Sequence, residues 1–61
     1  MFNEGDVVKT ITDLPMALTG SIGIVLPYHR VDAAGDVYRI RIVSDQRHLN
    51  YYVYGKNIKK I

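Results

Sequence analysis

The chain has 61 residues, of which 48% are hydrophobic and 23% charged, and its formal net charge is +2. This length forms one domain near the lower size limit for independent folding, and the hydrophobic fraction excludes a disordered chain. The chain has no cysteine, which excludes disulfides, thiolate metal ligands and a cysteine nucleophile.

The first half of the chain predicts two short strands separated by a loop. Residues 7–11 have the composition of a strand and follow a Gly-Asp turn signal. Residues 12–19 contain the turn formers Asp and Pro, so we expect a loop there. Residues 21–26 predict the second strand, in which Gly23 fits a strong bend. Pro27 lacks an amide donor and is expected to end regular pairing.

The third predicted strand has the clearest pattern. After an expected loop over residues 28–36, residues 37–43 alternate apolar and basic side chains. This alternation is typical of an antiparallel strand with one dry and one wet face. The expected inward side chains are Tyr38, Ile40 and Ile42, and the expected outward ones are Arg39 and Arg41.

Residues 44–48 predict a polar hairpin connection to a returning strand at residues 49–54, which is rich in aromatic side chains. Residues 55–57 break this strand, and residues 58–61 predict a short turn and a last strand. On the returning strand we expect Leu49, Tyr51 and Val53 inside and Asn50, Tyr52 and Tyr54 outside. The predicted inner set of the chain is Val8, Ile22, Ile40, Ile42, Val53 and Ile58.

Four stretches carry a family resemblance: Glu4-Gly5-Asp6-Val7-Val8, the G-x-x-G-x-V arrangement from Gly20 to Val25, Tyr38-Arg39-Ile40, and the segment from Val53 to Ile61. In this order the chain resembles the SH3-like barrels, in particular the KOW-type and related barrels of translation proteins and small accessory subunits. The resemblance implies an all-β fold for residues 1–61: one small antiparallel five-stranded barrel with a short turn before its last strand. Since this barrel hosts many unrelated activities, the resemblance implies no particular function.

The stretch Tyr51-Tyr52-Val53-Tyr54 also resembles the Val-Gln-Ile-Tyr stretch of the plasmid-borne type II dihydrofolate reductases, which are tetrameric barrels of this kind. Tyr54 and the aliphatic Val53 match that pattern. Tyr52 stands where those enzymes have a glutamine whose amide interacts with the ligands. This chain therefore differs from the reductases at a position that they use for function.

The sequence predicts no enzyme, no metal site and no cofactor. His29 and His48 are far apart and lack other ligand types at metal-site spacing, and no serine has a plausible His/Asp arrangement. Gly20 and Gly23 are interpreted as bend and packing positions because no phosphate-binding motif surrounds them. No apolar run reaches the roughly 20 residues that span a bilayer, and the first residues do not form a secretory signal, so we expect a cytoplasmic protein without membrane contact.

Charge is distributed unevenly along the chain. Residues 1–36 carry two basic and five acidic side chains, whereas residues 37–61 carry six basic and one acidic side chain. Such asymmetry can mark a basic binding face, although interleaved strands would dilute it in space.

The strongest candidate site combines Arg39 and Arg41 with Tyr52 and Tyr54 across the predicted hairpin. Tyr and Arg dominate the hot spots of protein interfaces, which favours a protein partner. The same pair types can stack on unpaired bases and neutralise phosphates, so nucleic acid is the alternative. A solvated face with cation–π pairs is the third interpretation.

Further candidates lie in two loops. Met16 and Leu18 either cap the barrel or offer an apolar contact, and Tyr28 and Arg30 are expected at the same rim. We therefore predict a non-enzymatic module that binds a protein, with self-association left open, through Arg39, Arg41, Tyr52, Tyr54, Met16, Leu18, Tyr28 and Arg30. For RNA or single-stranded DNA the predicted set is Arg39, Arg41, Tyr52, Tyr54, Lys56, Lys59 and Lys60.

Overall fold

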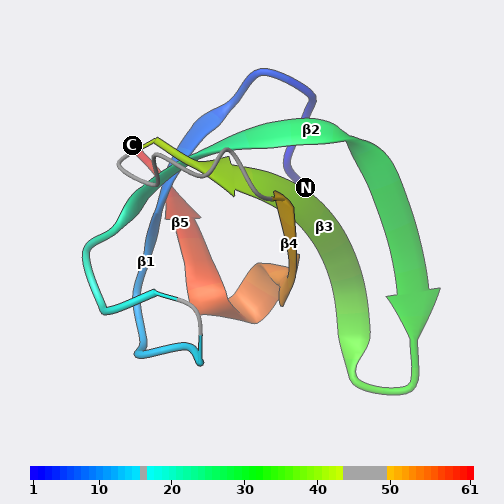
Figure 1. The fold of residues 1–61 in the computed structure, drawn as a ribbon. Helices are drawn as coiled ribbons and strands as arrows, with labels where there is room; N and C mark the ends of the chain where they lie inside the picture. The colour runs from blue at the N-terminus through cyan, green and yellow to red at the C-terminus, as the bar shows by residue number, and fades with distance from the viewer. Residues whose placement is uncertain (16, 44–49) are drawn as a thin grey trace.

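The computed structural model describes residues 1–15, 17–43 and 50–61. Its strands form one antiparallel five-stranded sheet in the order β4-β3-β2-β1-β5 (Figure 1). The elements are β1 (Val7–Thr10), β2 (Ile22–Asp32), β3 (Gly35–Ile42), β4 (Asn50–Tyr54), the 3-10 helix η1 (Gly55–Asn57) and β5 (Ile58–Lys60). The all-β prediction is thus confirmed, with a short turn before the last strand. The predicted 44–48 hairpin connection and the predicted inward Leu49 lie outside the described residues.

The prediction that Pro27 ends the second strand and that residues 28–36 form a loop is wrong. β2 continues to Asp32, and β3 already begins at Gly35, so the two strands form one long curved hairpin (Figure 1). Pro27 is tolerated because the pairing of β2 with β3 shifts register between Val25 and His29. A bulge leaves residues unpaired, so the missing amide donor of proline breaks no ladder bond there.

The hairpin turn is closed by two local features. The Ala34 amide donates to the Asp32 carboxylate at 2.8 Å, and Gly35 has a φ of +123°, which favours glycine. These residues belong to the segment 28–36 that was predicted as a loop, and only its middle forms the turn.

The core is built from the inward faces of all five strands. Its buried hydrophobic residues are Val8, Val25, Tyr38, Ile40, Ile42, Val53 and Ile58. Val37 is also buried, but it lies on the other face of β3, between Arg30 and Tyr54. The inward set on β3 is therefore confirmed, as are Val53 and Ile58. Tyr51 is only half-buried and packs against the core from its edge.

Ile22 was predicted inside and lies outside, where it is 37% exposed. Gly23 and Val25 are the inward residues of β2 at this end. A Cβ at Gly23 would lie 3.2 Å from Cδ1 of Ile40, so glycine lets the two strands approach closely over the core. The error is one of parity, because an inward Ile22 would lie on the face that Gly23 and Val25 occupy.

The only helix in the described part of the chain is the three-residue η1. None of the residues described there forms a helix that is long and apolar enough to cross a membrane.

Candidate functional site

The outer surface of β2, β3 and β4 gathers most of the predicted site residues. Arg39 pairs with Tyr52 across β3 and β4, while Val37 lies between Arg30 on β2 and Tyr54 on β4. Tyr28 lies in the β2 segment where the register shifts, opposite the Arg39 region of β3. We call this surface the tyrosine–arginine face, defined by Tyr28, Arg30, Arg39, Tyr52 and Tyr54.

The centre of the face is an aromatic pair. The rings of Tyr28 and Tyr52 meet edge to face, with centroids 5.0 Å apart and planes at 68°. Nε of Arg30 donates to the Tyr28 hydroxyl at 3.0 Å, which holds this guanidinium along the face. Tyr52 is 56% exposed, so it presents a large aromatic surface at a fixed position.

One end of the face is held by Asp32. The Tyr54 hydroxyl donates to its carboxylate at 3.0 Å. The Ala34 amide and, to a smaller extent, the Tyr54 hydroxyl lower the pKa of Asp32, because both bonds favour the charged carboxylate. The bond to Asp32 and the negative charge of this carboxylate raise the pKa of Tyr54. Nζ of Lys56 lies 5.6 Å from the centre of the Tyr54 ring, within cation–π range.

Arg39 is the least satisfied polar side chain of the face. Its Nε atom is buried, and it has no hydrogen-bond partner in the described part of the chain. No carboxylate among residues 1–15, 17–43 and 50–61 forms an ion pair with it. A partly desolvated guanidinium without an acceptor is costly, so an incoming carboxylate or phosphate would be favoured here.

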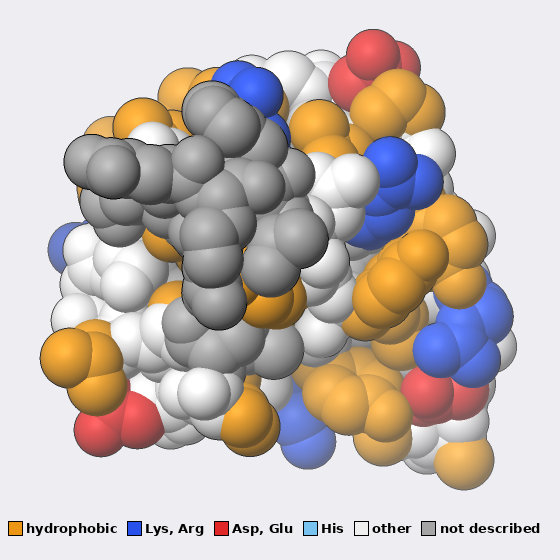
Figure 2. Space-filling view, viewed as in Figure 1, with side chains coloured by type: hydrophobic (Ala, Val, Ile, Leu, Met, Phe, Trp, Pro, Cys, Tyr) orange, Lys and Arg blue, Asp and Glu red, His pale blue; other side chains and the backbone are white. Residues whose placement is uncertain are grey.

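The face is basic overall. Among the described residues, Arg30, Arg39, Lys56 and the neighbouring exposed Arg41 are balanced by one carboxylate on this surface, that of Asp32. Figure 2 shows hydrophobic-class side chains, a class that includes tyrosine, alternating with Lys and Arg side chains along the right-hand part of the molecule. The face therefore complements an acidic partner better than a neutral one.

Of the remaining predicted residues, the three that the structure describes do not join this face. Leu18 is 74% exposed in the loop between β1 and β2, which Figure 1 places on the other side of the molecule from the β2–β3 hairpin. Lys59 and Lys60 lie on β5, at the sheet edge opposite β4. Lys60 Nζ also lies 3.6 Å from the Asp6 carboxylate. Met16 is outside the described residues. Among the described residues, the structure thus divides the predicted sets into the tyrosine–arginine face with Arg41 and Lys56, and Leu18, Lys59 and Lys60, which lie on other elements.

Asp32 is the site residue that the sequence analysis missed. It was assigned to a loop, because Pro27 was expected to end β2. The available signal was Asp followed by Ala-Ala-Gly, which suits a tight turn with an aspartate accepting from the amide two residues on.

No group of three or more His, Cys, Asp or Glu side chains in the described ranges could hold a metal ion. Comparison with protein-family models, curated proteins and solved structures finds no match for this chain.

Proposed function

We propose that this chain is a non-enzymatic binding module whose tyrosine–arginine face binds an acidic segment of a protein partner. The observation that carries the proposal is the state of Arg39. The half-buried Arg39 side chain lies beside Tyr52 in the centre of a basic face, and its buried Nε lacks a partner among the described residues. A carboxylate from a partner would pair with the part of this side chain that remains exposed, in a partly desolvated setting where charged hydrogen bonds are strong.

Rigidity of the face supports binding as its role. The Arg30–Tyr28 and Tyr54–Asp32 hydrogen bonds and the Tyr28–Tyr52 ring contact fix side chains before any partner arrives. Preorganised aromatic and arginine side chains lose little entropy on binding, which is why such residues dominate interface hot spots.

We also propose that the sheet belongs to an SH3-like barrel. The antiparallel order β4-β3-β2-β1-β5, the curved β2 with its register shift, and the 3-10 helix directly before β5 support this assignment. The resemblance to this fold suggests the type of scaffold, but it does not indicate which partner the chain binds.

The test is a peptide-display selection against the immobilised protein, followed by affinity measurement with the selected peptide. Acidic sequences are expected, with binding at least tenfold weaker in Arg39→Gln, about 1.4 kcal/mol. Lys59→Gln is the matched control, because it removes one positive charge from the far edge of the sheet. Selected peptides without acidic residues, or equal loss in both variants, would overturn the proposal.

Single-stranded nucleic acid is the second candidate, favoured by the exposed Tyr52 ring beside Arg39. Its binding must weaken steeply with salt, since phosphate neutralisation releases counterions. Binding of a labelled oligonucleotide with such a salt slope, lost in Tyr52→Ala and Arg39→Gln, would replace the protein partner by nucleic acid.

A further inference from the structure

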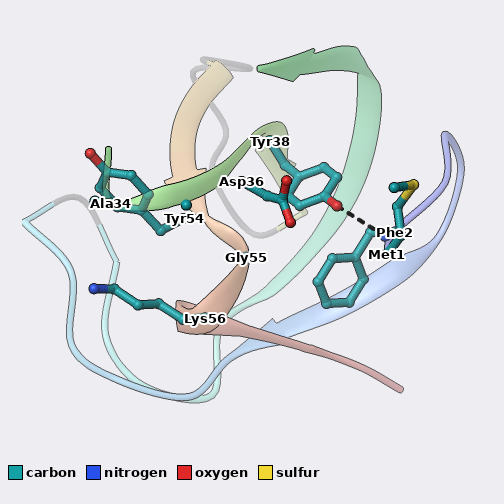
Figure 3. A pocket seen from close by; sticks show the side chains of 9 residues that line it. Met1, Phe2, Ala34, Asp36, Tyr38, Tyr54, Gly55 and Lys56 are labelled. Carbon is teal, nitrogen blue, oxygen red and sulfur yellow. Dashed lines mark hydrogen bonds between the residues drawn. The ribbon is translucent and has the colours of Figure 1, made fainter. Parts of the chain in front are cut away.

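A second candidate site lies where the β2–β3 hairpin, η1 and the first residues of the chain meet. These three segments line an open pocket of about 280 Å³ (Figure 3). A pocket of this volume has room for a small ligand or for a single side chain of a partner. The pocket is lined by Met1, Phe2, Ala34, Gly35, Asp36, Tyr38, Tyr54, Gly55 and Lys56.

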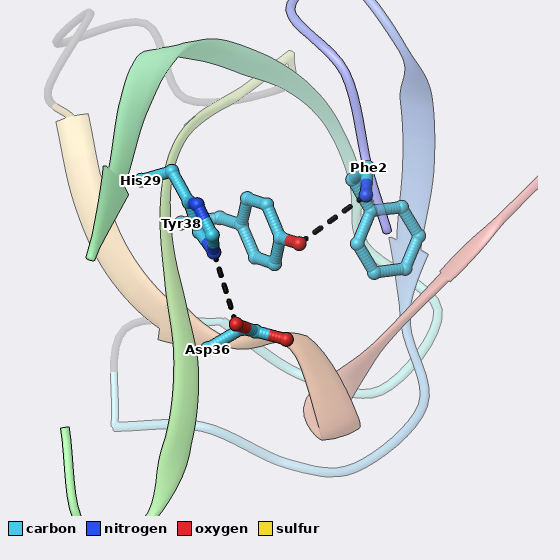
Figure 4. A network of polar contacts seen from close by, with 4 residues as sticks. All are labelled: Phe2, His29, Asp36 and Tyr38. Carbon is cyan, nitrogen blue, oxygen red and sulfur yellow. Dashed lines mark hydrogen bonds and ion pairs between the residues drawn. The ribbon is translucent and has the colours of Figure 1, made fainter. Parts of the chain in front are cut away.

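Asp36 provides the negative charge of this pocket. Its Oδ1 lies 3.0 Å from Nε2 of His29, and since an ionised carboxylate only accepts, Nε2 carries the proton of this bond. His29 is itself stacked on Tyr38, with ring centroids 5.0 Å apart. Figure 4 shows the other carboxylate oxygen pointing away from His29, toward the side on which Phe2 lies. The bond from His29 to Oδ1 thus orients the Asp36 carboxylate. Its other oxygen has no hydrogen-bond partner among the described residues and can accept a hydrogen bond from a ligand.

Phe2 provides an aromatic wall. Its ring meets Tyr38 edge to face at 5.2 Å, and its amide donates to the Tyr38 hydroxyl at 3.3 Å (Figure 4). Tyr38 is 2% exposed, so it fixes the wall from beneath rather than forming most of its surface. A Cβ at Gly55 would come within 3.1 Å of the Tyr38 ring and 3.7 Å of the Phe2 ring, so glycine keeps this corner compact.

Lys56 lines the pocket without opposing the charge of Asp36. Figure 3 shows its side chain extending away from Asp36 and Phe2. Its ammonium lies 5.6 Å from the centre of the Tyr54 ring instead.

We propose that this pocket binds a small organic ammonium ion, with the cation against both the second carboxylate oxygen of Asp36 and the aromatic ring of Phe2. A carboxylate beside an aromatic wall is the combination that recognises ammonium groups, because charge attraction and cation–π attraction act on the same ion. The ion can be a free amine or the side chain of a lysine on another protein, since both present the same group. The pocket shares Tyr54 and Lys56 with the tyrosine–arginine face, but Asp36 and Phe2, which would contact the ion, lie outside that face, so the inference does not rest on the function proposed for it.

The experiment is an NMR titration of the intact chain with n-butylammonium chloride, with sodium chloride holding the ionic strength constant. We expect saturable shifts at Phe2, Asp36 and Tyr38. Titration with 1-butanol, which has the same heavy-atom skeleton without the charge, should bind at least tenfold more weakly. To identify the source of the ion, a short peptide with one lysine is compared with the same peptide carrying acetyl-lysine. Binding of the lysine form alone assigns the site to proteins, and binding of butylammonium alone assigns it to free amines.

Asp36→Asn should weaken butylammonium binding at least tenfold, whereas Glu4→Gln, which removes the same charge outside the pocket lining, should leave it unchanged. Phe2→Leu keeps an apolar wall and should reduce the preference for butylammonium over 1-butanol. If Asp36→Asn disturbs the fold, the preference of Phe2→Leu for butylammonium over 1-butanol still tests the proposal. Equal binding of 1-butanol, equal effects of Asp36→Asn and Glu4→Gln, or no saturable shifts at the pocket residues would overturn the proposal.

Discussion

Tyr28 and Tyr52 meet edge to face at 5.0 Å although their strands, β2 and β4, are not paired with each other. Both flank β3, and the contact forms over the Arg39 region of that strand. The register shift in β2 brings Tyr28 to this place, so the face depends on an irregularity of the sheet.

The aromatic pair should be energetically coupled. In a double-mutant cycle with Tyr28→Leu and Tyr52→Leu, we expect a coupling free energy of about 0.5–1.5 kcal/mol from the edge-to-face contact. The measurement is urea-induced unfolding of the four proteins. Strictly additive losses would show that the two rings do not stabilise each other in solution.

The parity of β2 can be tested by the same substitution type on its two faces. Val25→Thr places a hydroxyl in the core and should lower the free energy of unfolding by about 1–3 kcal/mol. Ile22→Thr lies on the outer surface and should change it by only about 0.5 kcal/mol. Chemical denaturation measures both, and the reverse ranking would contradict the orientation of this strand.

Thr10 is the buried polar side chain of the described core, 1% exposed. Its hydroxyl donates to the Leu18 carbonyl at 2.7 Å and accepts from the Ser21 amide at 3.0 Å, which ties the β1–β2 loop to the sheet. Thr10→Val should lower stability by about 1–3 kcal/mol, because these bonds are lost without solvent to replace them. Thr10→Ser keeps the hydroxyl and should lose less in thermal unfolding. A larger loss for serine than for valine would assign the role to the methyl group.

The Asp32 carboxylate should make stability depend on pH. Because its pKa is lowered in the folded protein, its contribution is present above the ordinary carboxyl value of 3.8 and is lost as pH falls through the lowered value. The stability difference between the wild type and Asp32→Asn should therefore be larger at neutral pH than well below pH 3.8. Unfolding measured at both pH values checks this, and Glu4→Gln serves as the control without these bonds. A pH-independent difference would mean that the charge of Asp32 has no part in the effect.

The Tyr54 hydroxyl reports on the same bond from the other side. Asp32 raises the pKa of Tyr54, so the stabilisation from this bond is complete below the ordinary tyrosine value of 10.0 and is lost as pH rises through the raised value. In Asp32→Asn, tyrosinate should form at lower pH in an ultraviolet titration. Tyr54→Phe removes the Tyr54 ionisation from the titration curve and so identifies it. An unchanged titration in Asp32→Asn would rule out the hydrogen bond in solution.

Local pattern was sufficient for much of this protein. The alternation at residues 37–43 predicted the inward side chains of β3 and the outward arginines, because side chains alternate strictly along a strand. The Gly-Lys-Asn break before the last strand was likewise visible in the sequence, and it forms η1. The same rule predicted that Tyr52 or Tyr54 would lie beside an outward arginine, and the structure pairs Tyr52 with Arg39.

Tertiary structure alone decided what surrounds that pair. Proline in a run of β-type residues predicts an end to pairing, and only the partner strand shows that a register shift absorbs it and lets β2 reach Asp32. The same shift brings Tyr28 to the face, while the sheet order moves Lys59 and Lys60 away from it. The sequence by itself determined the all-β class, the alternation of β3 and the outward positions of Arg39 and Tyr52, since these depend on neighbours along the chain. The extent of β2 and the membership of the face depend on contacts between distant residues, which only the folded sheet establishes.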